Sequence, residues 1–222
     1  MSAVMVRRIQ GLSIARRCAE LGARLSTIEH VSGLPQSEFR HLAFPAQSTV
    51  PRGRIPTSID WLHRRTSLLG QAEAAIIMCT YRRLTDGGFP APDALLGAYS
   101  HYREICESPH RISLDRAFNL ASNMDGIWLA RKRCLHLVRC SACGSEYIGT
   151  IVSVDTAATP CCPFCPVLQR YALDPRLQAH FPERPIVGAG DLQVGVMALM
   201  RKHPLHLYGE GQADNRPAAV RA

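Results

Sequence analysis

The chain has 222 residues, of which 46% are hydrophobic and 20% charged, so it is long enough to bury a core and does not have a disordered composition. Its longest apolar run, at 74–79, is far too short to span a membrane, and its N-terminus lacks the apolar core of a signal peptide. We therefore expect a cytoplasmic protein with no membrane partner. The net charge of +8 favours polyanionic partners, and residues 1–65 alone hold ten arginines and four acidic residues.

Apolar residues at helical spacing predict a first helix over 6–31, which ends where Gly33 and Pro35 interrupt the pattern. A short second helix follows through "QSEFRHLA", residues 36–43. Together these segments predict a hairpin like a helix-turn-helix over 12–44. Its second helix would expose Gln36, Ser37, Arg40 and His41. A purely structural helical hairpin fits the same pattern, so both interpretations stay open at this point.

Residues 45–58 carry several prolines and the turn "PRGR", which predict an irregular linker. Three helical segments with short connections then occupy 61–130 and predict an α-helical bundle, so that 1–133 form one helical domain. Ser113 is expected to cap the last of these helices. The tyrosines and Trp128 occur at helical spacing, and we interpret them as core residues.

The hydrophobic period changes after residue 133. "CLHLVRC" and "SEYIGTIVSV" predict two short strands on either side of "CSACG", within an element that covers 134–171. Residues 172–222 are rich in proline and glycine, with one possible helix at 191–203, and we expect a loosely ordered extension. The predicted fold is mainly α: a helical bundle with a helix-turn-helix-like N-terminal hairpin and a small C-terminal four-cysteine element like a zinc ribbon.

The cysteines of this C-terminal element have the spacing of a zinc site. Cys140 and Cys143 form one C-x2-C pair, Cys162 and Cys165 form another, and eighteen residues separate the pairs. Two such turns can direct four thiolates at one ion in a tetrahedron. We predict one structural Zn2+ per chain. Cys161 breaks the matching spacing and is left out of the ligand set.

Other chemistries fit this cysteine pattern less well. Disulfides are rare in a reducing cytosol, and a redox C-x-x-C motif normally occurs singly in a βαβ context. An iron–sulfur cluster could also use four cysteines, but paired turns flanked by strands favour zinc. A four-thiolate site has no open position for a substrate, and the sequence holds no recognisable catalytic motif. We therefore predict neither an enzyme nor a small-molecule substrate.

Three segments of the sequence resemble a known family. "LGARLSTIE" (21–29), "IPTSIDWL" (55–62) and "RCSACGSEYI…CCPFC" (139–165) resemble, in the same order, the flagellar transcriptional activators of the FlhC family. The resemblance implies a helical protein with a C-terminal four-cysteine zinc site. It also implies that the chain works with a smaller D subunit, as two C and four D chains, to bind promoters of flagellar operons and recruit RNA polymerase.

The DNA contacts are predicted from charge and from the helix-turn-helix pattern, since the resemblance supplies none. The candidates are Arg24, Arg40, Arg52, Arg54, Arg131, Lys132 and Arg133. An alternative is a zinc-stabilised adaptor that binds a protein partner, which in turn makes the DNA contacts. An RNA-binding zinc ribbon is disfavoured because aromatic residues make up only 6% of the sequence, which leaves few side chains that could stack on bases.

Overall fold

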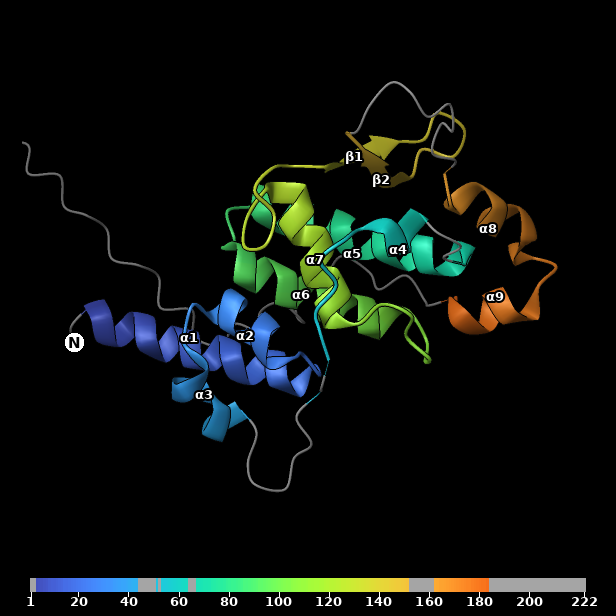
Figure 1. Cartoon of the computed structure of the whole chain (residues 1–222). Coiled ribbons are helices and arrows are strands. Elements are labelled where there is room, and N and C mark those ends of the chain that lie inside the picture. The colour runs from blue at the N-terminus through green and yellow to red at the C-terminus, as the bar shows by residue number, and fades with distance from the viewer. Residues whose placement is uncertain (1–2, 44–50, 52, 64–66, 152–161, 184–222) are drawn as a thin grey trace, which may run out of the picture. The chain divides into compact units, whose positions relative to one another are not determined.

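A computed structural model describes residues 3–43, 51, 53–63, 67–151 and 162–183 of the chain. In this part of the chain the fold is mainly helical, as predicted, and a two-stranded sheet follows the bundle (Figure 1). The helices are α1 (Ala3–Glu20), α2 (Leu25–Ser32), α3 (Gln36–Ala43), α4 (Asp60–His63), α5 (Leu68–Asp86), α6 (Ala91–Ile105), α7 (Leu114–Asp125), α8 (Phe164–Tyr171) and α9 (Pro175–His180). The strands are β1 (Leu135–Arg139) and β2 (Glu146–Thr150).

The single helix predicted over 6–31 is wrong, because the chain turns between α1 and α2. Gly22 has a φ of 80°, and its N–H donates to the carbonyl of Ala19 at 2.9 Å. The N–H of Ala23 reaches the carbonyl of Cys18 at 3.0 Å. This pair of bonds is a glycine-based helix stop. The apolar spacing continues across the turn, which is why the pattern did not reveal it.

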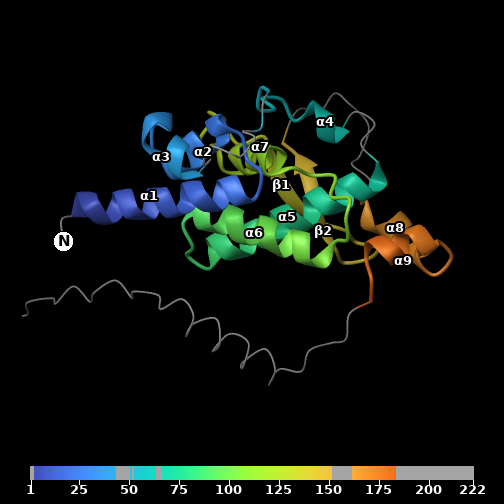
Figure 2. The ribbon, with the colours of Figure 1, turned by 90° about the horizontal axis from the view of Figure 1, so that it is seen from below.

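The second turn of the N-terminal region lies where the sequence predicted it. Gly33 ends α2 in the left-handed conformation, with a φ of 68°, and its N–H donates to the carbonyl of Glu29. Helix α3 then spans the predicted residues, and its own Phe39 is fully buried. Helices α2 and α3 both pack against α1, so three helices form this region (Figure 2).

Helices α5, α6 and α7 form the bundle that holds most of the buried core. Ser113 caps α7 as predicted, accepting from the N–H of Arg116 at 3.3 Å. Helix α7 ends at Asp125, before the predicted limit at 130, because Gly126 adopts a φ of 70°. The predicted aromatic core is confirmed for Tyr81 and Tyr102, which are fully buried. The other fully buried large side chains are Phe39, Phe118, Ile28, Ile77, Met78, Leu95, Leu96, Ile112, Leu114 and Leu120.

The segment at 53–59 contains neither helix nor strand, as expected of a linker, but it is fastened to α7. The amide of Asn119 donates to the carbonyl of Pro56 at 2.9 Å and accepts from the indole of Trp61 at 3.3 Å. The guanidinium of Arg116 lies over the same indole, 4.9 Å from its centre. Residues 45–50 and Arg52 of the predicted linker lie outside the described residues.

The C-terminal element contains the two predicted strands, which pair antiparallel with Leu137 opposite Ile148. The expectation of loose chain from residue 172 is wrong for its first part, because residues 175–180 form α9 and the side chain of Leu177 is buried. Asp174 caps this helix by accepting from the N–H of Arg176, a signal that the sequence contained. Residues 184–222, with the helix predicted at 191–203, lie outside the described residues.

None of the helices in the described ranges combines the length and the apolar character that crossing a membrane requires.

A buried carboxylate joins the N-terminal helices to the bundle. Asp115, at the start of α7, is 4% exposed. Its oxygens accept from the hydroxyl of Thr27 at 2.6 Å and from both the backbone N–H and the guanidinium of Arg24, at 3.1 and 2.9 Å. These three donors offset the cost of burying the charge. The turn between α1 and α2 is thus fixed against α7.

We expect Asp115→Ala to destabilise the protein by about 3 kcal/mol, because it removes the buried carboxylate to which Thr27 and Arg24 donate. Urea unfolding followed by circular dichroism measures this change. The matched control is Glu20→Ala, which removes the exposed partner of Arg16 and should cost less than about 0.5 kcal/mol. Equal losses in the two variants would contradict the role given to Asp115.

Candidate metal centre

The first cysteine pair lies in the turn between β1 and β2. The N–H of Cys140 donates to the carbonyl of Ser145, and the N–H of Gly144 donates to the carbonyl of Cys140, both at 2.9 Å. Gly144 has a φ of 75°, the left-handed conformation that glycine adopts at little cost. The turn therefore directs the sulfurs of Cys140 and Cys143 to the same side, as the C-x-x-C spacing predicted.

The second cysteine pair lies at the start of α8, far from the first pair in sequence. The sulfur of Cys140 lies 3.6 Å from that of Cys165, and the sulfur of Cys143 lies 3.6 Å from that of Cys162. All four sulfurs lie within 4.8 Å of one another. Zn–S bonds of about 2.3 Å in a tetrahedron place sulfurs about 3.8 Å apart. The spacing of this cluster therefore suits a single metal ion.

The four thiols differ in how readily they ionise. Hydrogen bonds from the side chain and backbone of Ser145 lower the pKa of Cys143 to about 6, and backbone hydrogen bonds also lower the pKa of Cys140. Burial raises the pKa of Cys162. Hydrogen bonds to the neighbouring sulfurs raise the pKa of Cys165 to about 12. The lowered pKa values favour thiolates in the turn, and the raised pKa values disfavour them in the pair at α8; a bound cation would favour the thiolate form of all four.

The cluster lies against α5, whose small residues allow close approach. Ala75 on α5, Tyr147 on β2 and Cys162 form a small buried apolar group, and Phe164 packs against it. Among the described residues, no His, Asp or Glu joins the four cysteines. Four sulfurs fill a tetrahedron, so the site can bind and hold a metal ion but offers no position for substrate. Cys161, which the spacing argument left out, lies outside the described residues.

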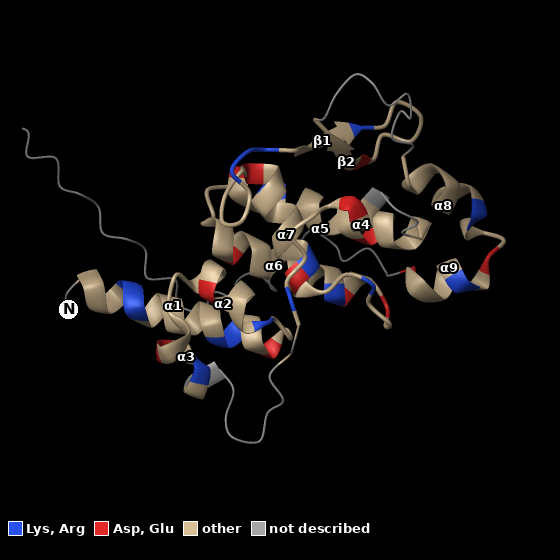
Figure 3. Cartoon of the chain, in the orientation of Figure 1, with Lys and Arg blue, Asp and Glu red and all other residues tan. Residues whose placement is uncertain are grey.

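The structure distributes the predicted DNA-contact residues over separate elements. Arg40 is exposed on α3, Arg54 is exposed in the segment before α4, and Arg131, Lys132 and Arg133 are exposed between α7 and β1. Figure 3 shows this last basic segment beside β1, with α1 and α2 between it and α3 in that view. Arg24 differs from the others because its guanidinium is bound to Asp115. Arg52 is not among the described residues.

The sequence did not reveal a buried polar network centred on α5. Glu73 is fully buried in α5 and is bound by Tyr102, Arg111 and His180. The sequence held one signal, which is a glutamate in the otherwise small and apolar stretch "AEAAII". A charge in such a stretch implies buried partners. Nothing in the sequence identified those partners.

Metal binding should protect the four cysteines from alkylation. We expect iodoacetamide to modify Cys140, Cys143, Cys162 and Cys165 slowly in metal-loaded protein and rapidly after chelation, as measured by mass spectrometry of peptides. Cys18 is the internal control, because burial raises its pKa to about 12 and should keep it unreactive in both states. Equal rates for the four cysteines with and without chelator would contradict a metal site.

The model of the family described as the flagellar transcriptional activator FlhC matches residues 1–176 of this chain. The flagellar transcriptional regulator FlhC of Cupriavidus necator is 28% identical over 149 residues, which are 65% of this chain and 69% of that protein. The FlhC regulator of Sodalis glossinidius is 29% identical over 145 residues, covering 62% of this chain and 68% of that protein. This is a family of transcriptional regulators and not of enzymes. The chain belongs to the FlhC family of flagellar transcriptional activators.

Proposed function

We propose that this chain is the C subunit of a flagellar regulator, which acts in the cytoplasm with a smaller D subunit to bind promoters of flagellar operons and recruit RNA polymerase. The match to the FlhC family over residues 1–176 carries this proposal. By the same resemblance, the assembly contains two C and four D chains. The exposed basic side chains supply the charge that binding to a DNA backbone requires.

We propose that the metal is zinc, bound once per chain, and that its role is structural. Four cysteine sulfurs 3.6 to 4.8 Å apart form a soft, tetrahedral donor set, which suits Zn2+. The described part of the C-terminal element has little core of its own. Tyr147 and Cys162 pack with Ala75 of α5, and Leu135 and Ile148 belong to the main core of the helical bundle. Zinc binding would therefore add folding energy to this element.

The basic segment Arg131–Lys132–Arg133 is the DNA contact that we favour. All three side chains are exposed, and the segment lies between the end of the bundle and the strand that leads to the metal site. Arg40 and Arg54 are further candidates because they too are exposed. Arg24 is the least suited, because its guanidinium already binds a buried carboxylate and leaving that partner would cost stability.

A second candidate function is an adaptor, in which the partner subunit makes the DNA contacts. This alternative is favoured because three arginines of the basic N-terminal region form ion pairs with acidic side chains. Arg8 pairs with Glu38, Arg16 with Glu20, and Arg17 with Asp93. These pairs reduce the positive field that α1 presents to a polyanion. A mobility-shift titration of promoter DNA with the C chain alone, the D subunit alone and both together separates the two functions.

Replacing Arg131, Lys132 and Arg133 together by alanine should weaken promoter binding by the complex with the D subunit. If each side chain contacts a phosphate, the slope of log affinity against log salt should fall by about 3, since about 0.9 is lost per contact. Fluorescence anisotropy over a salt series measures both quantities. The control replaces Arg103, Arg170 and Arg176, three exposed arginines on α6, α8 and α9. Identical slopes in the two triple variants would refute this DNA contact.

Elemental analysis of purified protein should find close to one zinc per chain. Cys165→Ser should lose the metal, because three sulfurs remain, whereas Cys134→Ser should keep it, because this cysteine lies outside the cluster. Iron in place of zinc, or full zinc content in Cys165→Ser, would contradict the proposed site.

A further inference from the structure

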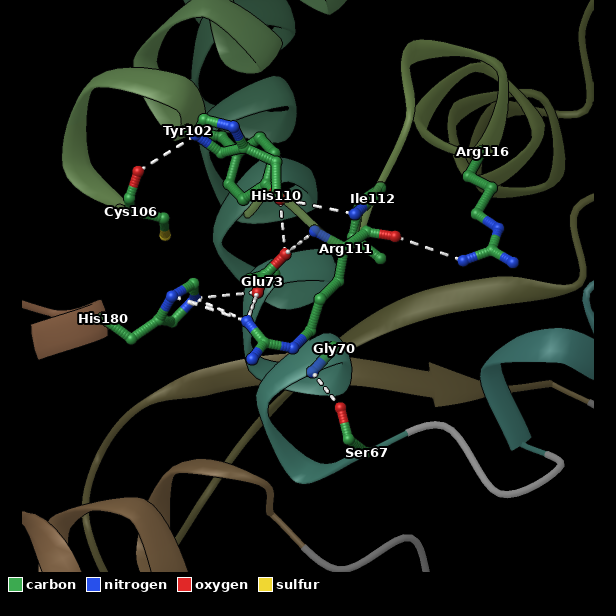
Figure 4. A network of polar contacts seen from close by, with 10 residues as sticks. All are labelled: Ser67, Gly70, Glu73, Tyr102, Cys106, His110, Arg111, Ile112, Arg116 and His180. Carbon is green, nitrogen blue, oxygen red and sulfur yellow. Dashed lines mark hydrogen bonds and ion pairs between the residues drawn. The ribbon is translucent and has the colours of Figure 1, made fainter. Parts of the chain in front are cut away.

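The centre of a polar network in the core is the carboxylate of Glu73, on α5. Glu73 is fully buried, and its Oε2 accepts from the hydroxyl of Tyr102 and from the backbone N–H of Arg111, the latter at 2.9 Å. Its Oε1 accepts from the guanidinium of Arg111 at 2.8 Å and lies 2.8 Å from Nε2 of His180, which donates to it in the Nε2–H tautomer; the same guanidinium lies 3.1 Å from that nitrogen. Figure 4 shows these donors converging on the carboxylate from different parts of the chain. The buried charge is thereby fully paired.

One of these donors attaches the end of the described chain to the bundle. His180 is the last residue of α9 and lies 107 residues from Glu73 in sequence, yet its side chain is only 6% exposed. Its ring packs edge-on against Phe181, with the ring centres 4.7 Å apart. Its backbone carbonyl accepts from the N–H of Glu107 at 3.0 Å, just beyond α6. Both the side chain and the backbone of His180 therefore hold α9 against the bundle.

Helix α9 in turn is bound to α8, which carries the second cysteine pair. The hydroxyl of Tyr171, the last residue of α8, donates to the carbonyl of Phe181 at 2.7 Å. The amide of Gln178 on α9 donates to the carbonyl of Tyr171 at 2.9 Å. Cys165 is the second residue of α8, so this eight-residue helix joins the α9 contacts to the metal cluster. A shift of α9 would move the sulfur of Cys165.

The first cysteine pair reaches α5 by other contacts. On α5, the sulfur of Cys79 donates to the carbonyl of Glu146 on β2 at 3.5 Å, and Arg83 pairs with the carboxylate of Glu146 at 3.7 Å. Strand β2 begins directly after the turn that holds Cys140 and Cys143. The two halves of the cluster are thus held to the same helix by separate sets of contacts.

We propose that the Glu73–His180 contact is a positioning device for the metal site: it fixes α9 and α8 so that Cys162 and Cys165 meet the cysteines of the turn. His180 is a positioning residue that contacts no sulfur ligand. This inference rests on the proposed function of the four-cysteine cluster as a metal site. Without the contact, α8 and α9 would be ordered in only a fraction of the metal-free chains. The apparent affinity for the metal would then be the intrinsic affinity multiplied by that fraction.

The test measures affinity for Co2+ and Zn2+ by chelator competition in the full-length chain. The absorption bands of a Co2+–thiolate complex report the number of sulfur ligands. We expect His180→Ala to lower the affinity by about tenfold, as it would if about one chain in ten kept α8 and α9 ordered, while retaining the four-thiolate spectrum at saturation. His180→Gln should restore most of the affinity, because its amide N–H can reach the Glu73 carboxylate from a similar position.

Thr27→Val is the matched control, because it also removes one side-chain hydrogen bond to a buried carboxylate, Asp115, in a part of the chain away from the cysteines. It should lower the melting temperature but leave metal affinity unchanged. If His180→Ala does not fold, Tyr171→Phe breaks the next bond of the same linkage at a partly exposed position and should lower the affinity about threefold.

Three results would overturn the proposal in distinguishable ways. Wild-type affinity in folded His180→Ala and Tyr171→Phe would exclude the positioning role alone. An equal loss of affinity in Thr27→Val would assign the effect to general destabilisation. A wild-type chain that binds neither metal would remove the metal site itself, and the positioning role with it.

Discussion

The packing of two cysteine pairs against one helix of the bundle is the constraint on which the C-terminal element depends. The sulfurs of Cys140 and Cys165 lie 3.6 Å apart although one belongs to a turn and the other to a helix. Neither the turn nor α8 has a substantial core of its own. Both are packed against α5, where Ala75 forms a buried cluster with Tyr147 and Cys162. The geometry of the cluster is therefore a consequence of the bundle. For the same reason, we expect a bound metal to stabilise the fold of the C-terminal element.

Three acidic groups of the bundle, two buried and one partly buried, are paired in the same way. Each of three carboxylates accepts from an arginine and from a hydroxyl group. Glu73 is bound by Arg111 and Tyr102, Asp115 by Arg24 and Thr27, and Asp125 by Arg82 and Tyr81. These arginines fix helices and loops to one another. Each of these pairs contributes no net charge, so the excess of +8 comes from basic residues outside them.

The sequence predicted the features that local rules determine. The spacing of the cysteines indicated one cluster, Gly33 marked the turn before α3, and Ser113 marked the start of α7. It did not reveal the turn at Gly22, because the apolar pattern runs on through it. It also could not pair Glu73 with His180, because such contacts between distant residues depend on tertiary packing. Helix α9 was missed because its six residues are too few to show a period.

The central claim is that four cysteines close a structural zinc site that is supported by the bundle. X-ray absorption spectroscopy at the zinc edge of the full-length protein tests it most directly, because the spectrum gives the number, type and distance of the ligands. We predict four sulfur ligands at about 2.3 Å and no nitrogen or oxygen ligand. Fewer than four sulfurs, or a nitrogen or oxygen ligand in the first coordination sphere, would contradict the account.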